Sequence, residues 1–387
     1  MADCKRKIIR ITTVPQSMRS LLKGQLRFMM QYYTVVAVTS DGEDYANMIN
    51  EQGVRGVKIN MTRRITPLRD LYALFQLIKL FIKEKPYIVH THTPKAGTLG
   101  MIAAYLTRVP HRIHTVAGLP LLEATGKKRK LLDFVEKITY KCATRVLPNS
   151  FALKDIILRN KLVSAEKIDV IGNGSSNGID TSYFCSESVC KSKEQLRSEC
   201  NIHKDDFVFI FVGRIVKDKG INELISAFKI VSAKYSKAKL LLVGPYEKEL
   251  DPIALESEQE IETSSSIISV GFQNDVLPYF KMADALVFPS YREGFPNVVM
   301  QAGAMGLPSI VTDINGCNEI IIERENGLII PSKSVSKLIK AMEEFIVNSK
   351  LVGNLQLSAR KLICNRYEQK DVWNAILKMY QDLDNSN

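Results

Sequence analysis

The feature that most constrains the fold of this chain is a repeated alternation of short apolar runs and helical segments. A first series of runs lies at residues 7–13, 33–39, 54–60, 87–92, 112–116, 145–148 and 168–171. A second series lies at residues 207–212, 238–243, 267–270, 285–288, 308–312 and 328–330. Buried strands that alternate with helices predict parallel sheets covered on both faces. The pattern therefore predicts an α/β protein with two such sheets.

The two series are separated by the most polar and glycine-rich stretch of the chain, residues 172–178. Such a stretch is typical of a hinge or linker. We expect a first domain over residues 1–180 and a second over residues 181–369, since 387 residues suffice for two cores. Two domains joined in this way face each other across a cleft, which is a common ligand site.

Two helical segments carry clear apolar stripes. Pro67 is suited to the first turn of a helix, and apolar residues follow it at helical spacing: Leu68, Leu71, Phe75, Ile78 and Ile82. We expect this stripe to face a core. A last helix, over residues 370–383, carries a similar set and must also pack against a domain.

The net charge of +12 is unevenly distributed along the chain. Residues 1–180 hold 29 Lys and Arg against 14 Asp and Glu, or +15, whereas the remainder holds 24 against 27, or −3. The basic residues include Arg63, Arg64, Lys79, Lys83, Lys85 and residues 127–130. This asymmetry indicates an anionic partner for the first half, such as nucleic acid, phospholipid headgroups or a phosphorylated acceptor.

Cysteine usage and hydropathy indicate an intracellular globular protein. The seven cysteines are scattered without a C-x-x-C pair, and Cys185, Cys190, Cys200 and His203 match no zinc spacing, so reduced thiols are expected. No apolar run is long enough to span a bilayer, and the N-terminus lacks the apolar core of a signal peptide. We therefore expect a cytoplasmic location.

A carboxylate follows one of the strongest strand patterns of the second half. After the apolar run at residues 285–289, Glu293 stands in a turn softened by Gly294, and Pro296 suits the start of the next helix. In an open α/β sheet this is the place where ligands bind, and a helix N-terminus offers free N–H groups to anions. The alternative is an ordinary strand-turn-helix with a solvated Glu293.

Two cations follow another strand of the same half. The run at residues 207–212 ends at Gly213, and Arg214 and Lys219 come next. A guanidinium fork and an ammonium together suit a diphosphate, although exposed basic side chains after a strand are the alternative. Strand ends of one sheet converge, so we expect these cations to lie near Glu293.

The first half offers fewer candidates. His90 and His92 lie in a strand pattern, and we expect their side chains to point to opposite faces of that strand. Gly24 stands among helical residues, where glycine is unfavourable by about 1 kcal/mol relative to alanine. We therefore expect Gly24 in a loop or at a helix start.

At this point the motifs resemble those of retaining glycosyltransferase family 4. Gly213-Arg214, Lys219-Gly220 and residues 293–297 are similar to its donor-site signatures, and residues 270–272 and 308–311 occur in the same order. In the first half the resemblance continues through residues 15–25, 89–94 and 173–184. It implies the GT-B fold, with two Rossmann-like domains and a final helix, residues 370–387, that completes the first domain.

The resemblance also implies roles for individual residues. Arg214 and Lys219 would hold the donor diphosphate and stabilise the departing nucleotide without a metal or other cofactor. Glu293 would accept hydrogen bonds from the transferred sugar, and His92 would lie near the reacting sugar. Further donor contacts are implied at Gly24, Gly213, Phe272, Gly294, Phe295, Pro296 and Asn297.

The sequence departs from the family pattern at one position. The usual motif has a second Glu eight residues after the first, which binds the ribose hydroxyls, but position 301 is Gln. An amide has one acceptor oxygen and a donor NH₂, whereas a carboxylate accepts at both oxygens. We expect weakened or rearranged ribose recognition at Gln301 and retained activity.

The resemblance and the charge together predict the reaction partners. The donor would be a nucleotide sugar, with a UDP-linked hexose or N-acetylhexosamine as the first expectation. The acceptor would be a lipid-linked glycan of capsule, O-antigen or exopolysaccharide assembly, bound by the basic first domain on an anionic membrane surface. The alternatives are a nucleotide-sugar epimerase or inverting transferase of the same fold, and a basic nucleic-acid-binding protein, for which no binding module is present.

Overall fold

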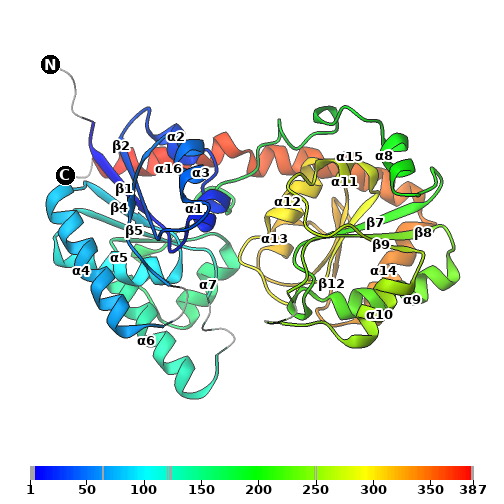
Figure 1. Ribbon diagram of the computed structural model, residues 1–387, viewed down its shortest axis with the longest axis horizontal. Coiled ribbons are helices and arrows are strands. Elements are labelled where there is room, and N and C mark those ends of the chain that lie inside the picture. Colours follow the sequence, from blue (N-terminus) through cyan, green and yellow to red (C-terminus); the bar gives the residue numbers. More distant parts are fainter. Residues whose placement is uncertain are drawn as a thin grey trace. The chain divides into compact units, whose positions relative to one another are not determined.

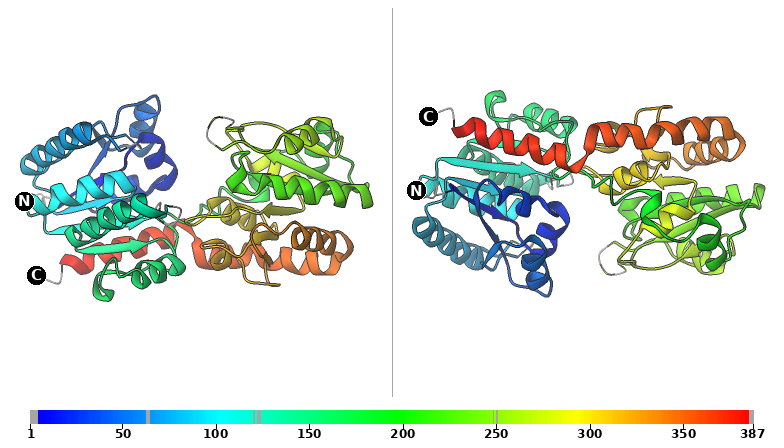
Figure 2. Two further views of the ribbon diagram at one scale, coloured as in Figure 1. Left: turned by 90° about the horizontal axis from the view of Figure 1, so that it is seen from below. Right: turned by 90° about the horizontal axis from the view of Figure 1, so that it is seen from above.

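The computed structural model describes residues 5–62, 65–119, 121, 124–247, 249 and 251–384. The chain forms two compact units, Met1–Gly178 with Lys370–Asn387 and Ile179–Gln369. Each unit contains a six-stranded parallel sheet with helices on both faces (Figures 1 and 2). The basic pair Arg63 and Arg64 lies outside the described residues.

The sheet of the first unit has the strand order β3-β2-β1-β4-β5-β6. Its strands are β1 (Lys7–Ile11), β2 (Thr34–Thr39), β3 (Arg55–Lys58), β4 (Ile88–Thr91), β5 (His111–Val116) and β6 (Arg145–Pro148). All neighbouring strands are parallel. The order reverses between β1 and β4, and such a switch point is where open α/β sheets bind ligands.

Side chains of β1 alternate between two helical layers, as the strand period of two requires. Ile9 and Ile11 belong to a core with α4 (Pro67–Glu84), α5 (Pro94–Leu106), α6 (Gly126–Cys142) and α7 (Phe151–Arg159). Ile8 belongs to the opposite core with α1 (Pro15–Leu21), α2 (Gln25–Met29), α3 (Tyr45–Gln52) and α16 (Gln369–Asp384).

The helix α16 packs on the first sheet through one apolar face. Its buried side chains are Val372, Ile376, Leu377, Met379, Tyr380 and Leu383. The last segment of the chain thus supplies part of the core of the first unit, as Figure 1 shows for the red helix.

The sheet of the second unit has the equivalent order, β12-β11-β10-β7-β8-β9. Its strands are β7 (Phe207–Val212), β8 (Ala238–Val243), β9 (Ile267–Ser269), β10 (Ala285–Phe288), β11 (Ser309–Thr312) and β12 (Gly327–Ile330). One face carries α9 (Ile221–Lys234), α10 (Leu255–Thr263) and α14 (Val335–Val347). The other carries α8 (Lys193–Glu199), α11 (Leu277–Met282), α12 (Asn297–Ala304) and α15 (Ser349–Tyr367). The switch point of this sheet lies between β7 and β10.

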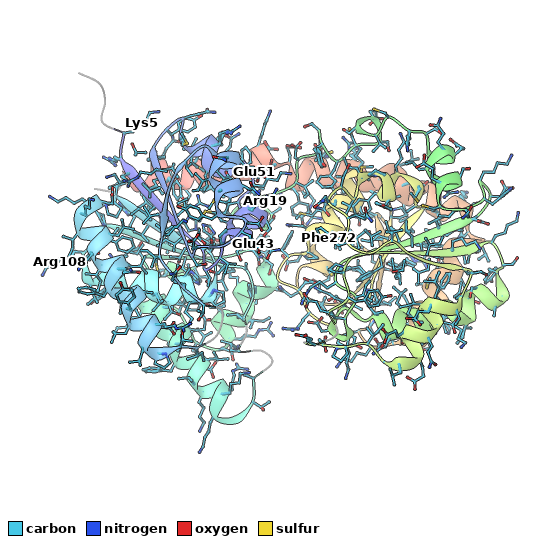
Figure 3. All side chains as sticks on the ribbon, viewed as in Figure 1. Lys5, Arg19, Glu43, Glu51, Arg108 and Phe272 are labelled. Carbon is cyan, nitrogen blue, oxygen red and sulfur yellow. The ribbon has the colours of Figure 1, made fainter. Side chains whose placement is uncertain are left out.

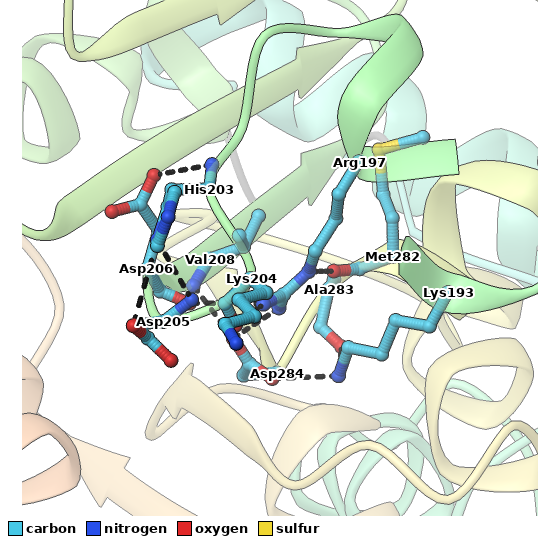
Figure 4. Close-up of polar contacts among 10 residues, drawn as sticks. All are labelled: Lys193, Arg197, His203, Lys204, Asp205, Asp206, Val208, Met282, Ala283 and Asp284. Carbon is cyan, nitrogen blue, oxygen red and sulfur yellow. Dashed lines mark hydrogen bonds and ion pairs between the residues drawn. The ribbon is translucent and has the colours of Figure 1, made fainter. Parts of the chain in front are cut away.

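A buried arginine of α8 forms hydrogen bonds to residues at the amino end of the second sheet (Figure 4). Arg197 donates to the carbonyl of Met282 at 2.8 Å and to Asp284 Oδ2 at 2.6 Å. Asp284 Oδ1 also accepts from Lys193 at 2.7 Å, and its Oδ2 accepts from the backbone N–H of Val208. Because the buried cation has a carboxylate partner and its donors are satisfied, its role is structural.

Pro296 stands at the start of α12, as the sequence indicated, at the N-cap position with a ψ of 109°. No helix in the described residues is long and apolar enough to cross a membrane. Two other expectations from the sequence were wrong. The run at residues 168–171 forms no strand and makes only an isolated bridge from Ile168 to Val146. The stripe that begins at Leu68 is largely exposed, and α4 instead buries Ala73, Leu77 and Phe81. Periodicity alone identified α4 as a helix but not the face that packs on the sheet.

Candidate active site

The carboxyl ends of the strands in the second unit bring most of the expected donor-site residues to one edge of the sheet. Gly213 and Arg214 follow β7, and Lys219 lies in the short 3₁₀ turn before α9. Glu293 follows β10, the neighbour of β7 at the switch point. Of the two cations expected near Glu293, Lys219 contacts it, whereas Arg214 pairs with another carboxylate, Glu247.

Lys219 and Glu293 form an ion pair across the switch point. The Lys219 ammonium donates to Glu293 Oε1, and the Ser290 hydroxyl lies 3.1 Å from the same oxygen. The two charged side chains are 16% and 15% exposed, so water reaches both and screens them only in part. The pair places one cation and one carboxylate within reach of a single ligand.

Two further cations after strands of this sheet pair with carboxylates other than Glu293. Arg214 donates to Glu247 Oε2 at 2.6 Å, and both side chains remain accessible to water. Arg292 donates to Asp218 Oδ2 at 2.8 Å. Exposed pairs of this kind contribute about 0–1 kcal/mol, so Arg214 can exchange Glu247 for another anionic partner at little energetic cost.

The loop that carries Glu293 is held from the next strand. Asn315, which follows β11, donates through Nδ2 to the carbonyl oxygens of Glu293 and Gly294 at 3.1 and 2.7 Å. Gly316 (φ 78°) is required here, because a Cβ would lie 2.6 Å from the Gly294 oxygen. Sequence reasoning missed Asn315, although its place after a strand of the same sheet was a usable signal.

The residues after Glu293 divide into core and surface positions. The Phe295 ring is buried against Tyr367 with ring centroids 5.4 Å apart, so only the Phe295 backbone faces the sheet edge. Asn297 and Gln301 are one turn apart on α12 and therefore share a face of that helix. Both keep contact with solvent.

Phe272 lies in the loop that follows β9, also at the carboxyl edge of this sheet. Its side chain is 67% exposed and projects from the ribbon (Figure 3). An exposed aromatic ring at a ligand-binding edge can stack on a planar group such as a nucleotide base.

In the first unit, Gly24 occupies a helix start, as expected. Its φ of 78° places it in the left-handed region at the N-cap of α2, and a Cβ there would lie 2.7 Å from the Trp373 ring. The indole N–H of Trp373 donates to Asn177 Oδ1 at 2.7 Å. Glycine is thus required both by the backbone and by the approach of α16.

His92 follows β4 at the switch point of the first sheet. Arg10 donates from Nε to His92 Nε2 at 3.0 Å, so the proton of the neutral imidazole resides on Nδ1. Burial, together with the charge of Arg10, holds the pKa of His92 well below 6.5. His92 Nδ1 is buried, and within the described residues it has no hydrogen-bond partner. His92 is thus a neutral donor held in one tautomer.

Arg10 and His90 complete this cluster. Arg10 also donates to Tyr380 Oη at 3.1 Å and to Gln25 Oε1, and no carboxylate pairs with it in the described part of the chain. His90 contacts Tyr380 Oη at 2.5 Å, and its ring lies 4.2 Å from that of His92. The expectation of opposite faces for the two histidines was wrong, because alternate residues of a strand share a face. The sequence could have singled out Arg10, because it is a charged residue inside the apolar run that forms β1 (Lys7–Ile11).

Comparison with known proteins identifies the class. Residues 26–174 match the family described as glycosyl transferase 4-like domain, and residues 192–362 match glycosyl transferases group 1. The solved structure of Anabaena Alr3699/HepE in complex with UDP superposes with a TM-score of 0.82 at 16% identity, covering 98% of this chain and 100% of that one. The architecture is the GT-B fold, as the sequence predicted.

Two relatives narrow the family further. The capsular polysaccharide biosynthesis glycosyltransferase CapM of Staphylococcus aureus is 36% identical over 97% of each chain. The UDP-Gal:alpha-D-GlcNAc-diphosphoundecaprenol alpha-1,3-galactosyltransferase of Escherichia coli is 29% identical over 84% of this chain and 82% of its own. The chain therefore belongs to the family 4 type glycosyltransferases and is a glycosyltransferase.

Proposed function

We propose that this enzyme transfers a hexose or N-acetylhexosamine from a UDP-sugar to a lipid-diphosphate-linked glycan, with retention of anomeric configuration. The reaction would serve the assembly of a capsule, O-antigen or exopolysaccharide. The names of the Staphylococcus and Escherichia relatives support a polysaccharide pathway, a UDP-sugar donor and a diphosphoundecaprenol-linked acceptor. The observation that carries the proposal is the Lys219–Glu293 pair at the β7–β10 switch point.

The pair suggests how a donor is received. A diphosphate carries more negative charge than the Glu293 carboxylate, and would draw Lys219 and Arg214 into charge-assisted hydrogen bonds. Glu293 would then be free to accept from hydroxyls of the sugar, as a carboxylate with several acceptor sites can. Asn315 fixes the backbone of Glu293, so the carboxylate needs little reorganisation on binding.

The transfer itself breaks the bond between the sugar C1 and the diphosphate oxygen, and forms a bond from C1 to the acceptor oxygen on the same face. Lys219 and Arg214 stabilise the negative charge that grows on the departing UDP. The proton of the acceptor hydroxyl passes to the leaving phosphate oxygen. The contacts of Lys219 and Arg214 with the diphosphate require no bound metal or other cofactor.

The first unit is proposed to hold the acceptor and the second the donor. His92 offers Nδ1–H as a donor to a sugar hydroxyl, and the loop at Gly24 is proposed to bind a diphosphate through its backbone. The excess of cations in residues 1–180 favours an acceptor with phosphates and a position on the anionic inner face of the cytoplasmic membrane. No role for nucleic acid is proposed.

Ligand binding and product analysis test this proposal. Thermal-shift measurements with UDP-, GDP- and ADP-sugars, with and without chelator, are expected to show stabilisation by a UDP-sugar in both conditions. Incubation with a lipid-diphosphate-linked acceptor should give a product whose new linkage has the anomeric configuration of the donor. An inverted linkage, or an epimerised donor without transfer, would support the alternative enzymes instead. Stabilisation by none of the nucleotide sugars would refute the proposal.

A further inference from the structure

The glycine-rich stretch between the two series of strands is buried over its second half. Ser175 and Asn177 are 6% and 7% exposed. The backbone N–H of Ser175 donates to the carbonyl of Asn149, which follows β6, at 2.7 Å. The Ser175 hydroxyl accepts from the backbone N–H of Gly178 at 3.0 Å. Ser175 has a φ of 67°, which a residue with a side chain keeps only where its surroundings hold it. This stretch has the composition of a linker but forms a fixed turn on the first unit.

The side-chain amide of Asn177 makes three hydrogen bonds to three other residues. Its Oδ1 accepts from Gln25 Nε2 at 3.0 Å and from the indole N–H of Trp373 at 2.7 Å. Its Nδ2 donates to the carbonyl of Lys23 at 3.0 Å. These partners fix the orientation of the amide, because only its oxygen accepts and only its nitrogen donates. Asn177 thus joins the loop at Gly24 to the helix α16.

Asn177 lies where the chain leaves the first unit, and Trp373 lies where the chain returns to it. The boundaries between the two units fall at residues 178–179 and 369–370. Just beyond the first boundary, Ile179 makes two backbone hydrogen bonds of 2.8 and 3.0 Å to the returning segment. The contact between Asn177 and Trp373 joins the same two segments of the chain a second time, inside the first unit.

The hydrogen bonds continue from Asn177 to the histidine cluster. Gln25 is fully buried, and its Oε1 accepts from Arg10, the residue that donates to His92. Gln25 Nε2 donates to the Ser176 carbonyl at 3.1 Å as well as to Asn177. Because both donors of this amide group are directed at the glycine-rich stretch, its oxygen is directed at Arg10. A shift of Asn177 therefore changes the hydrogen bonds that orient Arg10, and through Arg10 those of His92.

We propose that Asn177 is a positioning residue for the transfer reaction. It holds the loop at Gly24 directly, and it orients His92 through Gln25 and Arg10. This inference rests on the proposed function, which assigns substrate contacts to Gly24 and His92. The two groups share one anchor, so the loss of the Asn177 amide displaces both. Small displacements of groups that contact reacting atoms lower the rate far more than they lower stability.

The single tryptophan of the chain stands in this network and serves as its probe. The Trp373 ring lies against Gly24, where a Cβ would be 2.7 Å from it, and its centroid is 5.3 Å from that of Phe28. Indole emission depends on the hydrogen bond of the ring N–H and on the polarity around the ring. A donor that reaches the loop at Gly24 is therefore expected to change the fluorescence of Trp373.

Asn177→Ala tests this assignment in steady-state transfer from a UDP-sugar. The variant is expected to lower kcat at least about tenfold, because the loop at Gly24 and His92 lose their common anchor. The loss of UDP affinity, measured by calorimetry, should be smaller than the loss of kcat, since the cations of the second unit remain. Addition of the UDP-sugar should change the Trp373 emission of the unsubstituted protein and leave that of the variant unchanged.

A matched control and a second variant complete the test. Asn374 is an exposed asparagine of the same helix α16, and Asn374→Ala should keep the wild-type kcat and emission change. Trp373→Phe removes the indole donor but keeps an aromatic ring beside Gly24, so it should fold even if Asn177→Ala does not, and lower kcat about threefold. A wild-type kcat in folded Asn177→Ala, or in Trp373→Phe where the first variant does not fold, would overturn the proposal. A lower melting temperature with wild-type kcat would assign Asn177 a purely structural role and also overturn it.

The two proposals fail in different ways. Transfer by the unsubstituted protein with wild-type kcat in Asn177→Ala would leave the transferase proposal intact and remove the positioning role. If the unsubstituted protein binds no nucleotide sugar, the proposed function fails, and hydrogen exchange still tests the hold on the loop at Gly24. The backbone N–H groups of Gln25 and Phe28, which bond within this loop, should then exchange at least about tenfold faster in Asn177→Ala but not in Asn374→Ala. Equal exchange in the two variants would overturn the positioning role.

Discussion

Each unit buries an arginine, and the two arginines have opposite surroundings. Arg197 in the second unit pairs with Asp284 at the amino end of its sheet. Arg10 in the first unit lies on β1 beside the carboxyl-end switch point, with His92, Tyr380 and Gln25 as partners, and no carboxylate among the described residues pairs with it. Burial lowers the pKa of Arg10, which shows how poorly its charge is compensated.

The difference indicates that Arg197 has a structural role, whereas Arg10 positions His92. A buried ion pair with satisfied donors holds elements together, and its loss leaves a carboxylate without its main partner. A buried cation without a carboxylate partner is costly to bury, so the place of Arg10 next to His92 indicates a role at the ligand-binding end of the sheet.

Arg197→Met is expected to lower the free energy of unfolding by about 3 kcal/mol, because Asp284 loses a buried partner. Transfer activity of the remaining folded enzyme should be unchanged, since the site lies at the other end of the strands. Chemical denaturation measures the first effect and a transfer assay the second. In the double variant with Asp284→Asn the loss should be smaller than the sum of the two single losses. Reduced kcat at full folding would contradict the structural assignment of Arg197.

Arg10→Met is expected to show the reverse pattern, with kcat lowered about a hundredfold and the melting temperature nearly unchanged. Methionine fills a similar volume, but His92 loses the donor that holds its proton on Nδ1. Because the charge of Arg10 helps to lower the pKa of His92, the acid limb of the pH–kcat profile should move to higher pH in the variant. A wild-type rate and profile would show that Arg10 does not position His92.

The first unit is expected to be the more acid-sensitive. Burial lowers the pKa of His114 to about 4, and those of His90 and His92 fall well below 6.5. As the pH falls, these histidines are protonated at a higher pH in the unfolded chain than in the folded chain. The free energy of unfolding is therefore unaffected by them above about pH 6.5 and decreases as the pH drops below that value. His114 alone accounts for a loss of about 2 kcal/mol at about pH 5.

One buried carboxyl works against this loss. Burial raises the pKa of Glu136 to about 7, so its folded form favours protonation and adds about 2 kcal/mol between about pH 7 and 5. Since Glu136 offsets only the contribution of His114, His90 and His92 leave a net decrease in the free energy of unfolding. Hydrogen exchange at the two pH values should show weaker protection in β4 and β5 but not in β7 and β8, and Glu136→Gln should steepen the loss. Equal loss in both sheets would contradict this difference.

Gln301→Glu is expected to tighten donor binding by about tenfold, because a carboxylate accepts from both ribose hydroxyls. Calorimetry with UDP measures this directly, and Asn297→Asp on the same face of α12 is the control for added negative charge. Unchanged affinity would show that position 301 does not contact the ribose.

Much of the fold could be predicted from the sequence, because buried parallel strands are short apolar runs with turn signals between them. The runs before Gly213 and Glu293 became β7 and β10, and the second-half candidates gathered at one sheet edge for that reason. The exposed stripe of α4 could not be predicted, because periodicity shows that a helix has an apolar face but not whether protein covers it. The roles of Arg10 and Asn315 were not predicted, because they depend on partners that are distant in the sequence.

The proposed function depends on Lys219, which we propose receives the donor diphosphate at the β7–β10 switch point. The most direct test compares Lys219→Met with Lys217→Met, an exposed lysine of the same short turn, in steady-state transfer from a UDP-sugar. Lys219→Met is expected to lower kcat by about 10²- to 10³-fold, since it removes charge stabilisation of the departing UDP, while Lys217→Met should stay near the wild-type rate. Equal rates for Lys219→Met and the unsubstituted enzyme would contradict it.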